Sequence, residues 1–377
     1  MIYIISFLVS SLFLQRYVKY KGKGKKIFWW AAVLVPVTIA ALRSKEVGVD
    51  VLTYAYPFIQ PAQNLTLAGY LEFASGRGIN DFAYNIILYI CANYLGGLIP
   101  LLGILQFITI YCVYKRIVDF KDEAPVAVMS CIYLLLLYNR SLSMMRQCVA
   151  MAIIFYGLRY IHYNKKKYLL FVAVAFLFHS SAILGLSYLV ILYISDGKLS
   201  KIKSILICIA LVVAVTYYDM ILVPLTKLIF GDGTKYLAYF RTRNTGFVGN
   251  WDILYKVLAI VAILIFAKKK QMIGYYAMKN NSFMERKAGD DIFLFCFIVS
   301  VFNLVLYFLR RFNPDNYRFA LYFQILLFVV IPQVRKRFSK RNRIIVDSFI
   351  ILSCLLNWYI FMMVGDSYGT LPYAFCF

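Results

Sequence analysis

Long apolar runs alternate with short basic links along the whole chain. A membrane-spanning helix needs about 20 apolar residues and sometimes only about 17, and runs near that length recur throughout. The clearest of these runs are Met1–Leu14, Ile27–Leu42, Ile99–Tyr114, Val126–Tyr138, Gln147–Ile161, Ser204–Tyr217, Ile253–Ala267, Asp291–Leu309, Phe319–Pro332 and Ile344–Met363. With two irregular runs, they predict an all-α polytopic membrane protein of about 10–12 transmembrane helices, in a single transmembrane domain of residues 1–377.

The two irregular runs do not fit one full span each. Phe82–Tyr94 has a helical pattern but contains Asn85 and Asn93, and we expect it to lie in the interface or to dip in and out. Tyr168–Ile194 is too long for one span and short for two, and both its flanks are basic. Two short helices that meet near His179, or a re-entrant hairpin, would satisfy both flanks.

The basic links orient the chain, because lysine and arginine gather on the cytoplasmic side of membrane proteins. The densest links are Arg16–Lys26, Lys165–Lys167 and Arg335–Arg343, and we place them inside. Both termini then face outward, together with two long external loops at about 43–81 and 218–251.

Composition supports this interpretation. Of the 377 residues, 62% are hydrophobic and 18% aromatic, whereas a soluble domain is about 45–50% apolar. The formal net charge of +24 would suggest nucleic acid in a soluble chain, but here the cations lie in membrane links, so we expect no nucleic acid. The eight cysteines form no CxxC pair and are interpreted as small apolar side chains.

Arginines on the predicted outer face are the most unusual feature. Arg140 and Arg146 interrupt an apolar region in YNRSLSMMRQCVAMAII, where a guanidinium costs about 2.5–3.5 kcal/mol unless it faces a cavity or an anionic partner. Guanidinium groups grip phosphate oxygens in a fork. An anionic ligand such as a lipid-borne pyrophosphate is therefore indicated. Further arginines expected on this face include Arg43, Arg310, Arg311 and Arg318.

Two further stretches contain candidate chemistry. ALRSKEVGVDVLTY offers Arg43, Asp50 and Tyr54 around Gly48, or it is only a span end with a solvated loop. FLFHSSA contains His179, one of two histidines, which is either functional or a polar core residue bonded to a neighbouring helix. Arg310 and Arg311 have the alternative role of interfacial anchors.

Several enzyme signatures are missing from the sequence. It has no GxGxxG after a strand, no GxxxxGK[ST], no HExxH and no GxSxG. We therefore expect no nucleotide cofactor, no metal and no acyl-enzyme route.

Four short motifs in order resemble the EpsG family of bacterial polysaccharide polymerases, which is also described as Wzy-like. They are R…VGVDVLTY at Arg43–Tyr54, RSLSMMRQCVAMAI at Arg140–Ile153, FLFHSSAIL at Phe176–Leu184 and LPYAF at Leu371–Phe375. The resemblance implies a fold related to the integral-membrane (GT-C-like) glycosyltransferases. It also implies polymerisation of lipid-pyrophosphate-linked repeat units at the outer face of the bacterial cytoplasmic membrane, without a nucleotide sugar.

The reaction so implied needs a base at the acceptor hydroxyl and positive charge at the departing pyrophosphate. We expect His179 to be the base, or a hydrogen-bond partner of the pyrophosphate, and Asp50 to fix the acceptor. The reverse assignment stays open. The expected substrate-binding residues are Arg43, Tyr54, Arg140, Arg146, Gln147, Arg310, Arg311 and Arg318.

The expected partners are the polyprenyl-pyrophosphate-linked oligosaccharide, the lipid bilayer, a chain-length regulator and a flippase. Two other functions remain open. A flippase or exporter of the same lipid would share a cationic cavity but should show internal repeats, which the sequence lacks. A membrane acyltransferase would need a donor site on the inside, whereas the unusual polar residues lie outside.

Overall fold

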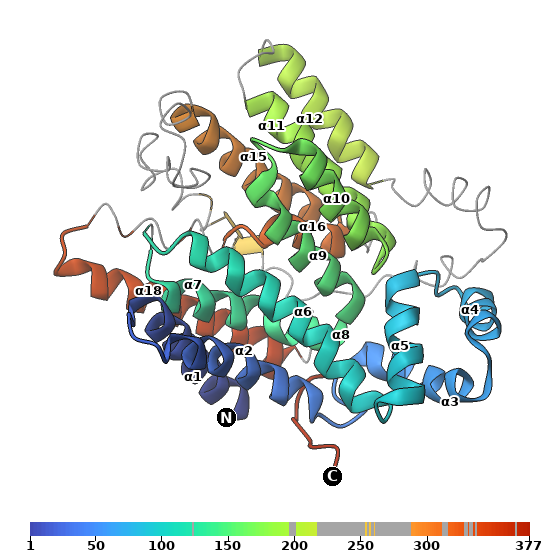
Figure 1. Cartoon of the computed structure of the whole chain (residues 1–377). Helices are drawn as coiled ribbons and strands as arrows, with labels where there is room; N and C mark the ends of the chain where they lie inside the picture. The colour runs from blue at the N-terminus through green and yellow to red at the C-terminus, as the bar shows by residue number, and fades with distance from the viewer. Residues whose placement is uncertain are drawn as a thin grey trace. The chain divides into compact units, whose positions relative to one another are not determined.

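The structure of the chain is a computed structural model. It describes residues 1–122, 124–195, 201–216, 253–254, 256–257, 260, 288–310, 316–327, 331, 335, 338–365 and 368–377. Every regular element within these residues is a helix (Figure 1), which confirms the all-α prediction. The predicted external segment 218–251 lies outside the described residues.

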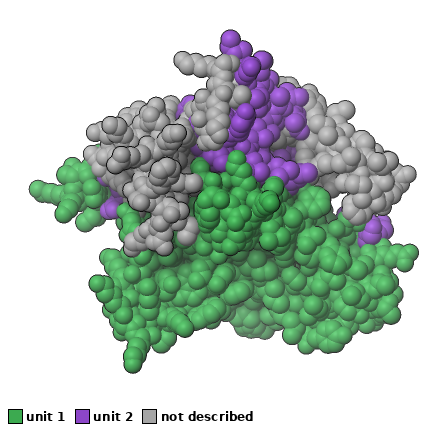
Figure 2. Space-filling model, turned by 45° about the horizontal axis from the view of Figure 1, so that its top comes forward, with its two compact units in different colours: residues 1–74, 79–182, 338–377 green, residues 75–78, 183–337 purple. Residues whose placement is uncertain are grey.

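The chain divides into two compact units, shown in green and purple in Figure 2. Unit 1 contains residues 1–74, 79–182 and 338–377, and unit 2 contains residues 75–78 and 183–337. The expectation of a single transmembrane domain is not tested by this division. Each unit is described by itself below.

Unit 1 contains most of the described helices. They are α1 Ile2–Lys19, α2 Lys25–Ala41, η1 Val51–Ala55, α3 Tyr56–Asn64, α4 Leu67–Gly76, α5 Phe82–Tyr94, α6 Leu98–Asp119, α7 Val126–Tyr133, η2 Leu134–Tyr138, α8 Asn139–Ser143, α9 Met145–Gly157, η3 Leu158–Tyr160, α10 Lys165–Phe176, α18 Asn342–Tyr359 and η9 Ile360–Val364. Four helices of the described part are long and apolar enough to cross a membrane: Ile2–Lys19, Leu98–Asp119, Val126–Ser143 and Asn342–Val364. The chain is therefore a membrane protein, and the total of 10–12 spans remains a prediction.

Helix α2 packs against α1 and α6 and contains Pro36 in its interior. A proline has no N–H, so the carbonyl four residues earlier, Ala32, loses its helical donor. The Ser10 hydroxyl on α1 donates to that carbonyl at 2.6 Å. The same hydroxyl lies 2.6 Å from the Tyr114 hydroxyl on α6. One serine thus satisfies a backbone group that hydrocarbon would leave unpaired and links three helices.

Two sequence predictions can be compared with helices of unit 1. The helical pattern at Phe82–Tyr94 is confirmed as α5. The segment 43–81, expected as a long loop, instead contains η1, α3 and α4. The sequence pattern did not predict these helices because α3 and α4 are only 9 and 10 residues long and lie in a segment with charges of both signs.

The C-terminal tail, residues 368–377, pairs with the segment that follows α2. Ser44 N–H donates to Ala374 at 2.8 Å, Cys376 N–H donates to Leu42 at 3.0 Å, and an antiparallel bridge joins Arg43 and Phe375. The Tyr373 hydroxyl also donates to the carbonyl of Ile39 at 2.9 Å. Residues more than 300 positions apart in the sequence therefore form one layer of unit 1.

Unit 2 is built from α11 Ser187–Ser195, α12 Lys201–Thr216, α15 Ala288–Leu309 and α16 Asn316–Gln324. Helix α15 packs against the other three. The Tyr188 hydroxyl donates to the carbonyl of Tyr322, which joins α11 to α16. The helix break predicted near His179 is observed, because α10 ends at Phe176, the 3-10 segment η4 (Ser180–Leu186) follows, and α11 begins at Ser187. Whether this region forms two short helices across the membrane or a re-entrant hairpin remains a prediction.

Candidate functional site

The buried segment from α7 to α9 positions both arginines of the central motif. The chain runs as α-helix to Tyr133, as π-helix through η2 and again as α-helix in α8. At Met144 the backbone leaves the helix (φ −92°, ψ 58°), and α9 begins at the next residue. Arg140 precedes this break and Arg146 follows it, so the two guanidinium groups belong to different helices. π-Helical turns of this kind are frequent at functional sites.

Arg146 lies in a compact group of charged and aromatic side chains. Its Nη1 donates to the Oδ2 of Asp81, and the two side chains are only 11% and 12% exposed. Its guanidinium carbon lies 4.2 Å from the ring centre of Tyr54 and 5.3 Å from that of Tyr84. The Tyr84 hydroxyl donates to the Tyr54 carbonyl at 2.7 Å, which fixes the two tyrosines relative to each other.

Asp50 completes this group, which we call the Arg146 cluster (Arg146, Asp81, Tyr54, Tyr84 and Asp50). Asp50 is half-buried, directly precedes the π-helical segment η1, and lies close enough to Arg146 to interact with its charge. Two carboxylates therefore act on one guanidinium. The predicted residues Asp50, Tyr54 and Arg146 are brought together here.

Gly48 fixes the approach of this segment to α8. It has a φ of +100°, and a Cβ at this position would meet the carbonyl oxygen of Leu142 at 2.4 Å. Its N–H donates to Gly369 of the C-terminal tail at 2.7 Å. A glycine is required here because only glycine accepts this backbone conformation with such close packing.

Arg140 has a different environment. It is buried on α8, with its guanidinium carbon 5.3 Å from the ring centre of Phe361 and 5.5 Å from that of Tyr368. The preceding residue, Asn139, accepts from the indole N–H of Trp358 at 2.9 Å and donates to the Thr370 hydroxyl at 3.0 Å. Arg140 therefore sits where α8, η9 and the C-terminal tail meet.

Arg43 is occupied by the backbone. It is 1% exposed, and its guanidinium donates to the carbonyls of Ala40 at 2.8 Å, Val47 at 3.0 Å and Leu142 at 3.0 Å. Burial lowers the pKa of this guanidinium to about 10. Carbonyls near the end of α2 and of α8 are thereby satisfied, since a helix leaves its last four carbonyls without partners.

His179 lies at the break between α10 and η4. The N–H of Ser181 donates to its Nδ1 at 3.2 Å, and the Ser181 hydroxyl lies 2.7 Å from the same nitrogen. Because a neutral imidazole that accepts at Nδ1 carries its proton on Nε2, Nε2 is assigned as the donor nitrogen. The neighbouring Leu177 carbonyl accepts from Ala83 N–H at 2.8 Å, which attaches this segment to the first turn of α5, two residues after Asp81.

The remaining predicted residues divide between the units. Gln147 is buried on α9, beside Arg146 in the sequence. Arg310 and Arg318 belong to unit 2, where Arg310 donates to the Tyr307 hydroxyl and Arg318 to the Tyr317 hydroxyl. Arg311 lies outside the described residues.

The sequence analysis did not select Asp81 or Tyr84. Asp81 directly precedes α5 and follows the glycine-containing stretch SGRGIN, which is the only local signal that it begins an element. Nothing local indicates that its partner is 65 positions away. Within the described residues, no group of three or more His, Cys, Asp or Glu side chains gathers to hold a metal ion.

Comparison with known proteins identifies the family. The family model described as the EpsG family matches residues 26–375, nearly the whole chain, and the chain therefore belongs to the EpsG family. This membership makes it a membrane protein of the polysaccharide-polymerase type, with an activity of the glycosyltransferase class. Neither a curated protein nor a solved structure matches.

Proposed function

We propose that this EpsG-family chain transfers a growing glycan from its polyprenyl pyrophosphate carrier to the next lipid-linked repeat unit, at the outer face of the bacterial cytoplasmic membrane. The observation that carries the proposal is Arg146 at the start of α9, paired with Asp81 and close to the rings of Tyr54 and Tyr84. A fixed guanidinium at a helix N-terminus suits an anionic group.

In this proposal, Arg140, Arg146 and the first turn of α9 supply the positive charge that stabilises the leaving pyrophosphate. When the glycosyl C–O bond to the pyrophosphate breaks, negative charge builds up on the departing oxygen. Preoriented cations and N–H dipoles stabilise that charge most in a site with little water. Asp81 orients Arg146 before substrate binds, and Gln147 contributes from the same turn.

In this proposal the proton of the acceptor hydroxyl goes to Asp50. His179 donates a hydrogen bond from Nε2 to the pyrophosphate. The sequence favoured His179 as the base, with the reverse assignment open. The acceptance of the Ser181 N–H by Nδ1 supports the reverse, since the remaining nitrogen then carries a proton and cannot accept another. Asp50 lies close enough to Arg146 to interact with its charge, and a carboxylate can act as the general base toward a hydroxyl group.

We assign structural roles to three of the arginines that were predicted to bind substrate. The buried Arg43, with its donors on three carbonyls, is proposed to hold the segment before Asp50 against α8 rather than to touch substrate. Arg310 and Arg318 are proposed to serve unit 2, where each has a tyrosine hydroxyl as partner.

The experiment that tests the function is analysis of lipid-linked glycans in a strain that lacks the chain. Single repeat units facing outward are the result expected for a polymerase. Units trapped on the inside would indicate a flippase instead, and normal polymer lacking acyl groups would indicate an acyltransferase. Complementation with Asp50→Asn, produced at the wild-type level, should restore no long polymer.

A further inference from the structure

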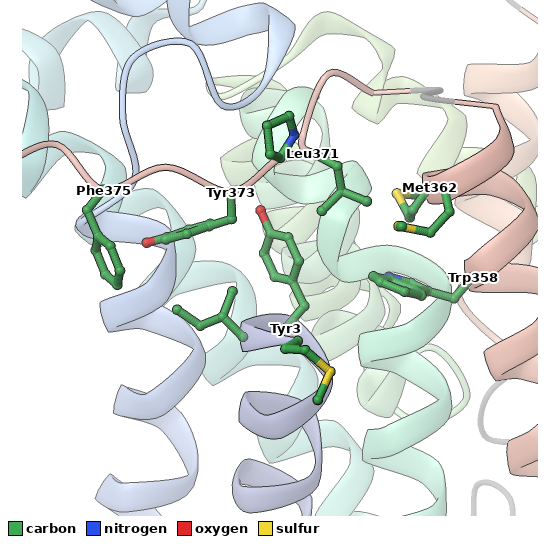
Figure 3. A pocket seen from close by; sticks show the side chains of 10 residues that line it. Tyr3, Trp358, Met362, Leu371, Tyr373 and Phe375 are labelled. Carbon is green, nitrogen blue, oxygen red and sulfur yellow. The ribbon is translucent and has the colours of Figure 1, made fainter.

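Unit 1 contains a cavity of about 660 Å3 at the meeting point of three chain segments (Figure 3). The segments are the first turn of α1, the end of α18 with η9, and the C-terminal tail. The labelled side chains lining it are Tyr3, Trp358, Met362, Leu371, Tyr373 and Phe375. Its volume lies within the range of about 300–1,000 Å3 that is typical of ligand pockets.

The lining is suited to hydrocarbon. The Tyr3 hydroxyl donates to the Thr370 carbonyl at 2.9 Å, and the Trp358 indole N–H donates to Asn139 at 2.9 Å. The framework thus occupies these two polar atoms and presents aromatic ring surface to the cavity. Thioether side chains such as Met362 adapt to irregular apolar shapes. A sugar would need polar partners that these groups already give to the backbone and to Asn139.

The position of the cavity points to a lipid. It adjoins the ends of α1 and of Asn342–Val364, two of the helices able to cross a membrane. Side chains at its edge are exposed, with Met363 58% and Phe375 44% exposed. Since the surroundings of a spanning helix are lipid, the space at this edge is accessible to a lipid chain.

A buried cation, Arg140, lies close to residues that line the cavity. Trp358 and Thr370 both hydrogen-bond to Asn139, and the next residue is Arg140. The guanidinium of Arg140 lies over Phe361, which directly precedes the lining residue Met362. An occupant with an apolar chain and an anionic head fits this pairing of apolar surface and positive charge.

We infer that this cavity binds the isoprenoid segment next to the pyrophosphate of the polyprenyl carrier, while Arg140 faces the head. The inference rests on the proposed function and assigns the chain-binding part of the same site. It also explains the pairing of the C-terminal tail with residues 42–48, because the tail supplies the cavity wall formed by Leu371, Tyr373 and Phe375.

Photo-crosslinking of the purified full-length chain in lipid nanodiscs tests the inference. The probe is a polyprenyl pyrophosphate with a diazirine on its first isoprene units, and mass spectrometry maps the adducts. We expect adducts on peptides containing Tyr3, Met362 and Leu371, removed by excess unlabelled polyprenyl pyrophosphate but retained in excess phosphatidylglycerol. Adducts elsewhere, or equal competition by phosphatidylglycerol, would overturn the inference.

A pair of variants on one helical segment provides a matched test. Met362→Trp fills the cavity and should reduce crosslinking about tenfold, equivalent to ~1.4 kcal/mol of binding. Leu352→Trp makes a comparable change at an exposed position of α18 and should leave crosslinking unchanged. Equal crosslinking in the two variants would contradict the assignment even if Met362→Trp folds poorly, because the wild-type adduct map stands independently.

The two proposals fail in different ways. Adducts in the cavity without polymerisation of lipid-linked units by the wild-type chain would refute the function and keep the polyprenyl site. Polymerisation without adducts in the cavity would keep the function and refute the site.

Discussion

Helix α9 has an arginine near each end, and the helix dipole favours one of these cations and disfavours the other. Arg159 follows the C-terminal end, where the backbone carbonyls favour a cation. It donates to Asp119 at 2.6 Å and to the Lys115 carbonyl at 3.4 Å. Arg146 lies in the first turn, where the helix dipole disfavours a cation. The position of Arg159 is explained by the fold alone, whereas that of Arg146 requires a further cause.

The two arginines also differ in the number of carboxylates available to each guanidinium. In the Asp119 cluster (Asp119, Arg116 and Arg159), two guanidinium groups share one carboxylate that is 26% exposed. In the Arg146 cluster, two carboxylates act on one guanidinium among two tyrosine rings. The first arrangement suits a structural link at a membrane boundary, and the second suits a site that prepares charged groups for a reaction.

The largest expected effect is on the carboxylates. Asp50→Asn should lower the polymerisation rate about 10³-fold if Asp50 is the base, since general-base catalysis contributes about 10²–10⁴-fold. Asp119→Asn removes a carboxylate from the Asp119 cluster, which has no role in the proposed chemistry, and should lower the rate less than about threefold at equal amounts of folded protein. Initial rates with purified lipid-linked units measure both. A full rate in Asp50→Asn would return the role of base to His179.

His179→Gln separates the two roles proposed for the imidazole. The glutamine amide can still donate a hydrogen bond but accepts no proton near neutral pH. If His179 donates from Nε2, the rate should fall only about tenfold, the loss expected for one weakened hydrogen bond. A fall as large as that of Asp50→Asn would identify His179 as the base and contradict our assignment.

Asp81→Asn tests orientation of Arg146 rather than chemistry. The loss of the carboxylate leaves Arg146 charged but less well fixed between Tyr54 and Tyr84, so we expect about a tenfold lower rate with a raised KM. Asp81→Glu should recover part of the rate, because it restores the charge. If neither variant differs from wild type, the ion pair has no role in binding.

The smallest expected effect concerns pH and stability. Burial, with further contributions from Arg116 and Lys165, lowers the pKa of His162 to about 4. The unfolded chain, with a pKa of about 6.5, binds more protons below that pH, so the folded state loses stability as pH falls from about 6.5 toward 4. At pH 5 the free energy of unfolding is about 2 kcal/mol lower than at neutral pH because of this histidine.

His162→Gln should therefore show a smaller drop in melting temperature between pH 7 and pH 5 than the wild type, with unchanged activity at pH 7. Identical pH dependence in the two proteins would mean that His162 is not buried as a neutral imidazole. A loss of activity at pH 7 would indicate that groups beyond the C-terminal end of α9 take part in the reaction, contrary to the proposal.

The sequence predicted the parts of unit 1 that local patterns determine. Apolar length identified the spans within α6 and Val126–Ser143, and the helical pattern at Phe82–Tyr94 proved to be α5. The cost of charge near hydrocarbon singled out Arg140 and Arg146, and both are buried beside aromatic rings.

Contacts between distant residues could not be predicted in this way. Asp81 is 65 positions from Arg146, and Thr370 is 231 positions from Asn139. The function of Gly48 was also hidden, because its need for a positive φ arises only from Leu142 on another helix. Arg43 looked like a ligand-binding cation by charge alone, while its carbonyl partners depend on the tertiary fold.

The most direct test of the central claim is binding of polyprenyl pyrophosphate to Arg146→Lys and Arg159→Lys in nanodiscs, with polyprenyl monophosphate as the reference ligand. Lysine keeps the charge but loses the fork that grips two phosphate oxygens. The account predicts that Arg146→Lys weakens pyrophosphate binding about tenfold or more, and that Arg159→Lys binds as the wild type does. Equal affinities in the two variants would contradict it, because both arginines would then be only structural.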